Sequence, residues 1–265
     1  MRLIDRFGGF VFDLDGTVYL DNVLLPGAAA TLAAVREQGK PHVYLTNKPL
    51  ERSEFYAGLL RQLNVPTVDE QVVSSLDALI LYLGESAPGT RIFCVSEPLV
   101  VAVLEEAGFE VVSESEAETA EFVVVSFDRT FDYAKLHAAY RAVKAGARII
   151  ATNPDRFCPT AEGGLPDCAA MLAAVEACTG VRAEAIVGKP SPHMAAAVLD
   201  RLGLPAARIL VVGDRLGTDV AMAAGAGMAA ALVLSGDSQR DDLAASELRP
   251  TYVLDTIAGL IEERG

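Results

Sequence analysis

Two carboxylates separated by a single residue, Asp13 and Asp15, follow the short apolar run Gly9–Phe12. Side chains two positions apart in an extended chain point to the same side, so these two can face one space. Two anions so close together require a cation or a shared proton, and their oxygens suit Mg²⁺. Gly16 lets the backbone turn sharply after them. A strand that ends in an ordinary Asp-Gly turn explains the same residues, so this segment alone leaves both interpretations open.

Two later stretches also place polar side chains after apolar runs. Thr46 and Asn47 follow residues 42–45, and their hydroxyl and amide groups can hold phosphate oxygens. A helix cap or a turn uses the same residue types. Lys189 follows residues 184–187, where its charge can neutralise a phosphate or a buried carboxylate. A surface lysine is the simpler alternative on spacing alone.

The fourth stretch contains Asp214, which comes directly after an apolar run, and Asp219, which opens an expected helix. The helix dipole alone would favour a carboxylate at that place. A loose G-x-G-x-x-A pattern at residues 225–230 follows this helix and precedes a strand. Because a dinucleotide fingerprint has the opposite order, we interpret the glycines as a helix end and do not expect a dinucleotide oxidoreductase.

The elements that must position these residues alternate along both ends of the chain. Short β-rich runs alternate with longer helical stretches, which is typical of βαβ units and a mainly parallel sheet. The polar stretches fall at the carboxyl ends of the expected strands, where such sheets bind their ligands. Strands are expected at 9–12, 42–45, 72–73, 184–187, 208–212 and 228–234, and helices at 26–38, 51–63, 191–202 and 219–226.

A second set of elements interrupts the first and indicates an inserted domain. Its strands are expected at 91–95, 122–125 and 148–151, and its helices at 97–107, 132–145 and 167–179. We place the boundaries near Asp77 and Val181. Residues 1–77 and 181–265 then form the core, and residues 78–180 form the insert.

Composition and charge narrow the functional classes. The chain has 265 residues, 51% of them hydrophobic and 22% charged, which is the profile of a globular protein. Its 22 Lys and Arg against 36 Asp and Glu give a net charge of −14, so nucleic acids and anionic membranes are poor partners. The 4 cysteines form no C-x-x-C pair, and no apolar run is long enough to span a bilayer. We expect a cytoplasmic protein.

In this order, the four polar stretches resemble the motifs of the haloacid dehalogenase (HAD) superfamily of phosphohydrolases. The stretches Asp13–Tyr19, Leu45–Asn47, Thr152–Asp155 and Gly188–Pro192 are similar to the NagD-type or 4-nitrophenylphosphatase-like subgroup, subclass IIA. Two further stretches, residues 125–128 and 167–171, look closest to an arabinose-operon sugar phosphatase branch. The resemblance covers nearly the whole chain. It implies an α/β fold, with a Rossmann-like, doubly wound parallel core and an inserted α/β cap of the C2 type.

The resemblance also implies Mg²⁺-dependent hydrolysis of phosphate monoesters through an aspartyl-phosphate on Asp13. Asp15 would protonate the leaving oxygen and then activate water. Thr46 and Asn47 would bind the transferring phosphoryl group, and Lys189 would offset the charge of Asp13 and the phosphate. These assignments agree with the chemistry, because a carboxylate that attacks a phosphate dianion needs nearby positive charge.

The implied magnesium ligands are the Asp13 carboxylate, the Asp15 backbone carbonyl and Asp214. Asp219 would stand next to them without touching the ion. The full set of residues that we expect around the substrate is Gly16, Thr46, Asn47, Lys48, Asp155, Asp167 and Lys189.

The inserted domain is expected to act as the lid that selects the substrate, a small phosphate ester. Asp167 can accept hydrogen bonds from sugar hydroxyls, or it can simply cap the helix that follows it. Phe127, Phe131 and Phe157 are the aromatic residues that could stack on a nucleobase, but they form no obvious platform. We therefore favour sugar phosphates, with 4-nitrophenyl phosphate as a substrate in vitro. Other polar candidates of the lid are Arg129, Asn153 and Arg156.

Several alternatives stay open. Within the same chemistry, the substrate could be a nucleoside monophosphate, phosphoglycolate or glycerol phosphate. A protein that binds phosphate esters without turnover is the alternative from another class, although Asp13, Asp15 and Lys189 are all present. A phosphomutase is disfavoured, because the phosphomutases of this superfamily usually carry a cap between the first two motifs. The chain from Asp13 to Thr46 is too short to hold one. The sequence is compatible with a monomer or a homodimer.

Overall fold

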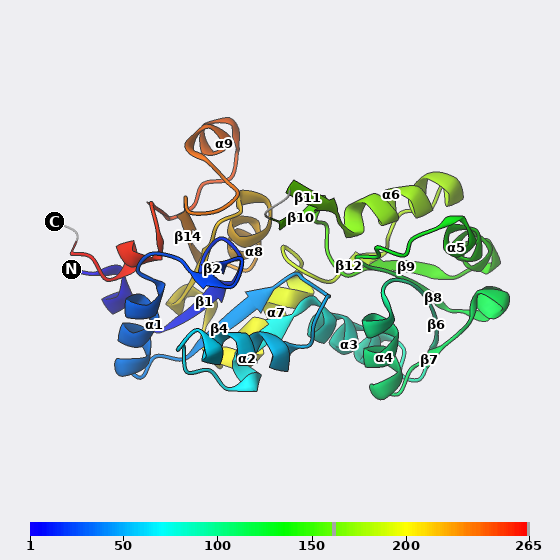
Figure 1. Cartoon of the computed structure of the whole chain (residues 1–265), viewed down its shortest axis with the longest axis horizontal. Helices are drawn as coiled ribbons and strands as arrows, with labels where there is room; N and C mark the ends of the chain where they lie inside the picture. Colours follow the sequence, from blue (N-terminus) through cyan, green and yellow to red (C-terminus); the bar gives the residue numbers. More distant parts are fainter. Residues whose placement is uncertain (161–162, 264–265) are drawn as a thin grey trace. The chain divides into compact units, whose positions relative to one another are not determined.

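The computed structural model describes residues 1–160 and 163–263, and the chain divides into two compact units (Figure 1). Unit 1 comprises Met1–Thr46, Ser53–Val73 and Lys189–Gly265, and unit 2 comprises Asn47–Arg52 and Ser74–Gly188. Both predicted boundaries, near Asp77 and Val181, therefore lie inside unit 2, and residues 47–52 of the predicted core also group with it.

Unit 1 is built on a parallel sheet of six strands in the order β15-β14-β13-β1-β4-β5. In Figure 1, β1 and β4 run side by side, with α1 and α2 close by. A small antiparallel hairpin, β2 and β3, follows β1. The strands are β1 (Gly9–Asp13), β2 (Tyr19–Leu20), β3 (Val23–Leu24), β4 (His42–Thr46), β5 (Val72–Ser74), β13 (Ile209–Gly213), β14 (Ala229–Val233) and β15 (Tyr252–Leu254).

Helices cover both faces of this sheet, because side chains along each buried strand alternate between the faces. On one face, Phe10 and Phe12 of β1 pack with Leu32 of α1 and Leu60 of α2 in one apolar cluster. On the other face, α7 contacts β4 and α8 contacts β14. The helices are α1 (Ala28–Glu37), α2 (Ser53–Gln62), α7 (Pro192–Leu202), α8 (Ala221–Gly225) and α9 (Arg240–Ala245).

Unit 2 contains a second parallel sheet, in the order β12-β9-β8-β6-β7, and a hairpin of β10 and β11. Val123 and Val125 of β8 pack against Ala139 of α5 and Val175 of α6. The strands are β6 (Arg91–Val95), β7 (Glu110–Val111), β8 (Phe122–Val125), β9 (Arg148–Ala151), β10 (Phe157–Thr160), β11 (Gly163–Pro166) and β12 (Ala185–Ile186). The helices are α3 (Ser75–Ser86), α4 (Pro98–Glu106), α5 (Tyr133–Ala145) and α6 (Cys168–Thr179).

The doubly wound α/β architecture is the one that the sequence predicts. Two of the predicted elements differ in the structure. The strand expected at 184–187 is β12, which pairs with β9 of unit 2 rather than with the sheet of unit 1. The helix expected at 219–226 begins as a π-helical turn, Leu216–Val220, and only then continues as α8.

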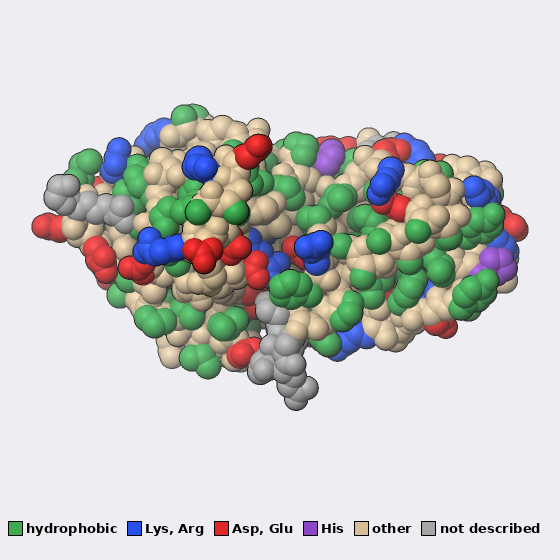
Figure 2. Space-filling view, turned by 90° about the horizontal axis from the view of Figure 1, so that it is seen from above, with side chains coloured by type: hydrophobic (Ala, Val, Ile, Leu, Met, Phe, Trp, Pro, Cys, Tyr) green, Lys and Arg blue, Asp and Glu red, His purple; other side chains and the backbone are tan. Residues whose placement is uncertain are grey.

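The surface agrees with the acidic composition. On the face seen in Figure 2, Lys and Arg side chains stand singly or in small groups between acidic and apolar ones. No helix among residues 1–160 and 163–263 is long and apolar enough to cross a membrane.

Candidate active site

Three of the four predicted polar stretches meet at one edge of the unit 1 sheet. Asp13 is the last residue of β1, Thr46 is the last residue of β4, and Asp214 directly follows β13. The strand β1 lies between β13 and β4, and all three run parallel. Their carboxyl ends therefore place these side chains on neighbouring positions of the edge.

Lys189 lies among the carboxylates at this edge. Its Nζ donates hydrogen bonds to Asp13 Oδ1 at 2.5 Å and to Asp219 Oδ1 at 2.8 Å. The side chains are almost fully buried, with 4% of Lys189, 10% of Asp13 and 2% of Asp219 exposed. Carboxylate oxygens of Asp13, Asp214 and Asp219 lie within 4.8 Å of one another. Two of these three clustered carboxylates, Asp13 and Asp219, thus bond to the buried ammonium group of Lys189.

The pKa values of the two carboxyl groups that stand beside Asp13 are raised. Burial, followed by the charges of Asp13 and Asp219, raises the pKa of Asp214 well above its ordinary value. Burial also raises the pKa of Asp219, although the charge of Lys189 lowers it in part. Burial alone would lower the pKa of Lys189, but the charges of Asp13 and Asp219 raise it above its ordinary value. Lys189 therefore stays protonated, and the charge of Arg215 offsets only a part of the rise in the pKa of Asp214.

The donor set fits a divalent cation that prefers oxygen ligands. Asp13, Asp214 and Asp219 supply carboxylate oxygens, and one lysine leaves their combined charge negative. Mg²⁺ is bound in proteins by one or two carboxylates and keeps several waters, so this cluster has enough ligands for it. A bound cation would also remove the repulsion that raises the pKa of Asp214.

The turn after Asp214 explains how Asp219 reaches Lys189. The N–H of Val220 donates to the carbonyl of Arg215, which widens the turn into a π-helix. The N–H of Arg215 donates to Asp219 Oδ2 at 3.1 Å, so this oxygen is held while Oδ1 accepts from Lys189. The sequence predicts an acid at a helix start here, but the structure makes it a partner of Lys189.

The turn after Asp13 is built as the sequence predicts. Gly16 has a φ of +81°, and its N–H donates to the carbonyl of Tyr19 at 2.8 Å. A Cβ atom at Gly16 would lie 2.5 Å from Asp214 Oδ2, so the glycine is also required by the close approach of that carboxylate. Asp15 is half-buried and forms an isolated bridge with Tyr19.

The strand that precedes Lys189 belongs to a different sheet than the sequence suggests. The sequence suggests a strand of the catalytic sheet before it, but β12 belongs to the sheet of unit 2. Gly188 is the last residue of unit 2, and Lys189 is the first residue of the final segment of unit 1. Ser191 then caps α7, where its side chain accepts from the N–H of Met194.

Four of the predicted substrate-binding residues belong to unit 2, namely Asn47, Lys48, Asp155 and Asp167. Asn47 Nδ2 donates to Asp155 Oδ2 at 3.0 Å. A phosphate contact by Asn47 would need another of its atoms or the exchange of this bond. Asp167 caps α6, where Oδ1 accepts from the N–H of Cys168 at 2.6 Å.

The other candidates of unit 2 divide by exposure. Phe127 is only 1% exposed, so the prediction that it could stack on a nucleobase is wrong. Phe131 packs against the unit 2 core, whereas Phe157 is 42% exposed. Arg129 is an exposed residue whose Nε donates to Glu97 Oε1 at 2.5 Å. The loop at residues 234–238 contains no predicted site residue, yet it lies against Asp214.

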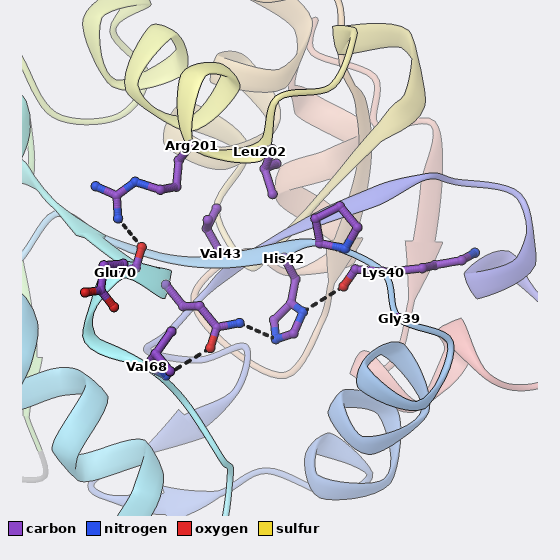
Figure 3. A pocket seen from close by; sticks show the side chains of 10 residues that line it. Gly39, Lys40, His42, Val43, Val68, Glu70, Arg201 and Leu202 are labelled. Atoms are coloured by element: carbon purple, nitrogen blue, oxygen red, sulfur yellow. Dashed lines mark hydrogen bonds between the residues drawn. The ribbon is translucent and has the colours of Figure 1, made fainter.

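A cavity of about 470 Å³ at the amino end of β4 contains none of the predicted site residues (Figure 3). His42 Nδ1 donates to the carbonyl of Lys40 at 3.0 Å, and Gln71 Nε2 donates to His42 Nε2 at 3.1 Å. Arg201 donates to the carbonyl of Glu70. Burial lowers the pKa of His42, which keeps the ring neutral. These polar groups bond to one another, so we assign the cavity no role in the chemistry.

Two family models match this chain. Residues 10–110 match the family model of haloacid dehalogenase-like hydrolases, and residues 186–260 match a HAD-hydrolase-like model. The chain is 34% identical over 249 residues to the sugar phosphatase AraL of Bacillus subtilis, covering 94% of this chain and 90% of that protein.

Solved structures match over nearly the full length. The 4-nitrophenylphosphatase of Thermotoga maritima is 35% identical, with a TM-score of 0.90 and 98% of both chains covered. NagD of Escherichia coli is 32% identical, with a TM-score of 0.86, covering 95% of this chain and 97% of that one. The chain therefore belongs to the haloacid dehalogenase-like hydrolases, in the NagD-type group, subclass IIA.

Proposed function

We propose that this protein hydrolyses phosphate monoesters of small metabolites, sugar phosphates foremost, with Mg²⁺ as its cofactor. The observation that carries this proposal is the group of three buried carboxylates around one lysine at the carboxyl edge of the sheet. The relatives named as phosphatases support the reaction class, and the one named as a sugar phosphatase supports the substrate class.

In the first step, an oxygen of the Asp13 carboxylate attacks phosphorus and the ester P–O bond breaks. The leaving oxygen takes a proton from Asp15, which is half-buried two residues beyond the nucleophile. In the second step, Asp15 takes a proton from water, whose oxygen attacks the same phosphorus. The bond between phosphorus and Asp13 breaks, and inorganic phosphate leaves. The covalent intermediate divides one difficult displacement into two easier ones.

Lys189 holds Asp13 in place and supplies positive charge beside the transferring group. Thr46 ends the neighbouring strand β4, so its hydroxyl can bind a phosphoryl oxygen. Mg²⁺ held by Asp13, Asp214 and the Asp15 carbonyl, with Asp219 beside them, would neutralise charge on the nucleophile and phosphate when bound. The residues therefore supply the two things that phosphoryl transfer needs most, positioning and electrostatic stabilisation.

We further propose that unit 1 is the catalytic domain and that unit 2 selects the substrate. Asp155 and Asp167 are buried acceptors in unit 2 that suit sugar hydroxyls. Phe127 is buried, which weakens the case for a nucleobase. The cysteines of the structure are free thiols, as suits a reducing cytoplasm, and we expect a monomer or homodimer there.

The test is phosphate release from sugar phosphates, nucleoside monophosphates, phosphoglycolate, glycerol phosphate and 4-nitrophenyl phosphate, with Mg²⁺ and with chelator. Asp13→Asn should abolish turnover, and Asp200→Asn, an exposed acid of α7, serves as the matched control. Turnover that survives in Asp13→Asn would contradict the proposal. A preference for nucleotides over sugar phosphates would contradict the substrate class alone.

A further inference from the structure

The loop at residues 234–238, which joins β14 to α9, lies against the carboxylate of Asp214. Since β14 pairs with β13 in the sheet, its carboxyl end brings this loop to the place where Asp214 follows β13. We propose that the loop positions Asp214 for a divalent cation, with Gly236 and Ser238 as positioning residues. This inference rests on the proposed function. It adds to the site a loop that lies outside the four polar stretches.

Backbone N–H groups of the loop bond to the side-chain carboxylate and to the main-chain carbonyl of Asp214. The N–H of Asp237 donates to Asp214 Oδ2 at 2.7 Å, and the N–H of Ser238 donates to the carbonyl of Asp214 at 3.1 Å. One bond orients the carboxylate and the other fixes the backbone from which it projects. A carboxylate held in this way loses little conformational freedom when a cation binds.

Gly236 makes this approach possible. A Cβ atom at Gly236 would lie 2.0 Å from Asp214 Oδ2 and 2.6 Å from its Cγ. On another side, a Cβ atom at Gly16 would lie 2.5 Å from the same oxygen and 3.1 Å from the Cα of Gly236. The two glycines therefore pack directly against the carboxylate of Asp214. A side chain at position 236 would displace this carboxylate.

Side chains of the loop join two more parts of the site. Ser235 Oγ donates to the carbonyl of Gly16 at 2.8 Å. Ser238 Oγ accepts from the N–H of Leu216 at 3.1 Å, at the start of the π-helical turn that carries Asp219. The loop thus connects the turn after β1 with the turn after β13, the two segments that supply the carboxylates.

These contacts predict a specific defect. Displacement of Asp214 should weaken metal binding, while Asp13 and Lys189 keep their places and their mutual bond. Turnover should then recover when the metal concentration is raised, because the chemical groups are intact. A general loss of structure would instead lower activity at every metal concentration.

The experiment measures Mn²⁺ binding to the full-length metal-free protein by titration calorimetry and electron paramagnetic resonance. We expect Gly236→Ala to bind Mn²⁺ at least tenfold more weakly than the wild type. Gly225→Ala is the matched control, because a Cβ atom there has nothing within 4 Å. Its affinity should equal that of the wild type, and saturating metal should restore the turnover of Gly236→Ala.

An affinity of folded Gly236→Ala within twofold of the wild type would overturn the inference. If Gly236→Ala does not fold, Ser235→Ala and Ser238→Ala remove the side-chain bonds that join the loop to the turns after β1 and β13. Unchanged affinity in both variants would overturn the inference. The proposed function fails separately. A wild type that binds Mn²⁺ but hydrolyses no ester would contradict the phosphatase assignment, and the affinity comparison would still decide the role of the loop.

Discussion

Each unit buries an aspartate in a loop after a parallel strand, but the surroundings of the two aspartates differ. In unit 2, Asp128 follows β8 and its side chain is fully buried. Its Oδ2 accepts from Lys135 Nζ at 2.7 Å, and its Oδ1 accepts from the N–H and hydroxyl of Thr130. One carboxylate therefore has one cation and two further donors.

In unit 1, Asp214 follows β13 and shares its surroundings with Asp13 and Asp219, for which Lys189 is the buried cation. A loop that follows a parallel strand thus carries a balanced charge in one unit and an excess of negative charge in the other. Balance suits a group that maintains the fold, because a buried charge without a partner is costly. The excess in unit 1 is the charge that the proposed cation would balance. Charge balance, more than burial, separates the two roles.

The largest difference should appear in catalysis. Asp13→Asn removes the nucleophile and should lower turnover of 4-nitrophenyl phosphate by about 10³-fold or more. Asp128→Asn should leave turnover of the same ester nearly unchanged at temperatures where the protein is folded. Steady-state kinetics of the two variants at saturating Mg²⁺ checks this. An equal loss in both would show that the balanced aspartate is also catalytic.

Variants of Lys189 and Lys135 should differ in whether Mg²⁺ restores their stability. Lys189→Met and Lys135→Met each leave buried carboxylates without their cation, which costs about 3–5 kcal/mol of stability for such a pair. Mg²⁺ should restore part of the loss in Lys189→Met, because a cation can replace the ammonium group there. It should restore nothing in Lys135→Met. Urea unfolding with and without Mg²⁺ measures this, and equal rescue of both variants would contradict the comparison.

A smaller effect should appear in the pH dependence of stability without metal. Burial and the charges of Asp13 and Asp219 raise the pKa of Asp214 in the folded state. The folded protein then binds this proton more tightly than the unfolded chain, in which the pKa of an aspartate is about 3.9. The stability that this proton contributes is complete below the pKa of the unfolded chain. It is lost as the pH rises through the pKa of Asp214 in the folded state. The loss is about 1.4 kcal/mol for each pH unit that separates the folded pKa from the unfolded one.

Urea unfolding in chelator from pH 4.5 to 8.5 tests the sign. The wild type should lose stability with rising pH more steeply than Asp214→Asn, and Mg²⁺ should reduce the difference. Parallel curves for the two proteins would mean that Asp214 does not carry the excess charge.

The sequence predicts the part of the site that depends on strand ends. Apolar runs that end at Asp13, Thr46 and Asp214 predict β1, β4 and β13, and the parallel order then brings their ends together. Two local signals were overlooked. Asp21 and Asn22 have φ values of 48° and 61°, as a two-residue hairpin turn requires, and they join β2 to β3.

The second overlooked signal begins α3. Ser74 and Asp77 cap this helix reciprocally, a spacing that is visible in the sequence. The remaining differences have no local signal. Lys189 follows a strand of the other sheet, and the loop that contains Gly236 meets Asp214 only because β14 pairs with β13. Both depend on strand order, which residue spacing does not encode.

The most direct test compares Asp214→Asn with Asp128→Asn by urea unfolding at pH 8 in chelator. Asparagine keeps the shape of the side chain and removes the charge. If the carboxylates of unit 1 are in excess, Asp214→Asn should be more stable than the metal-free wild type by about 1–2 kcal/mol. Asp128→Asn should be less stable by about 1–3 kcal/mol, because Lys135 loses its partner. Destabilisation of both variants would contradict the account.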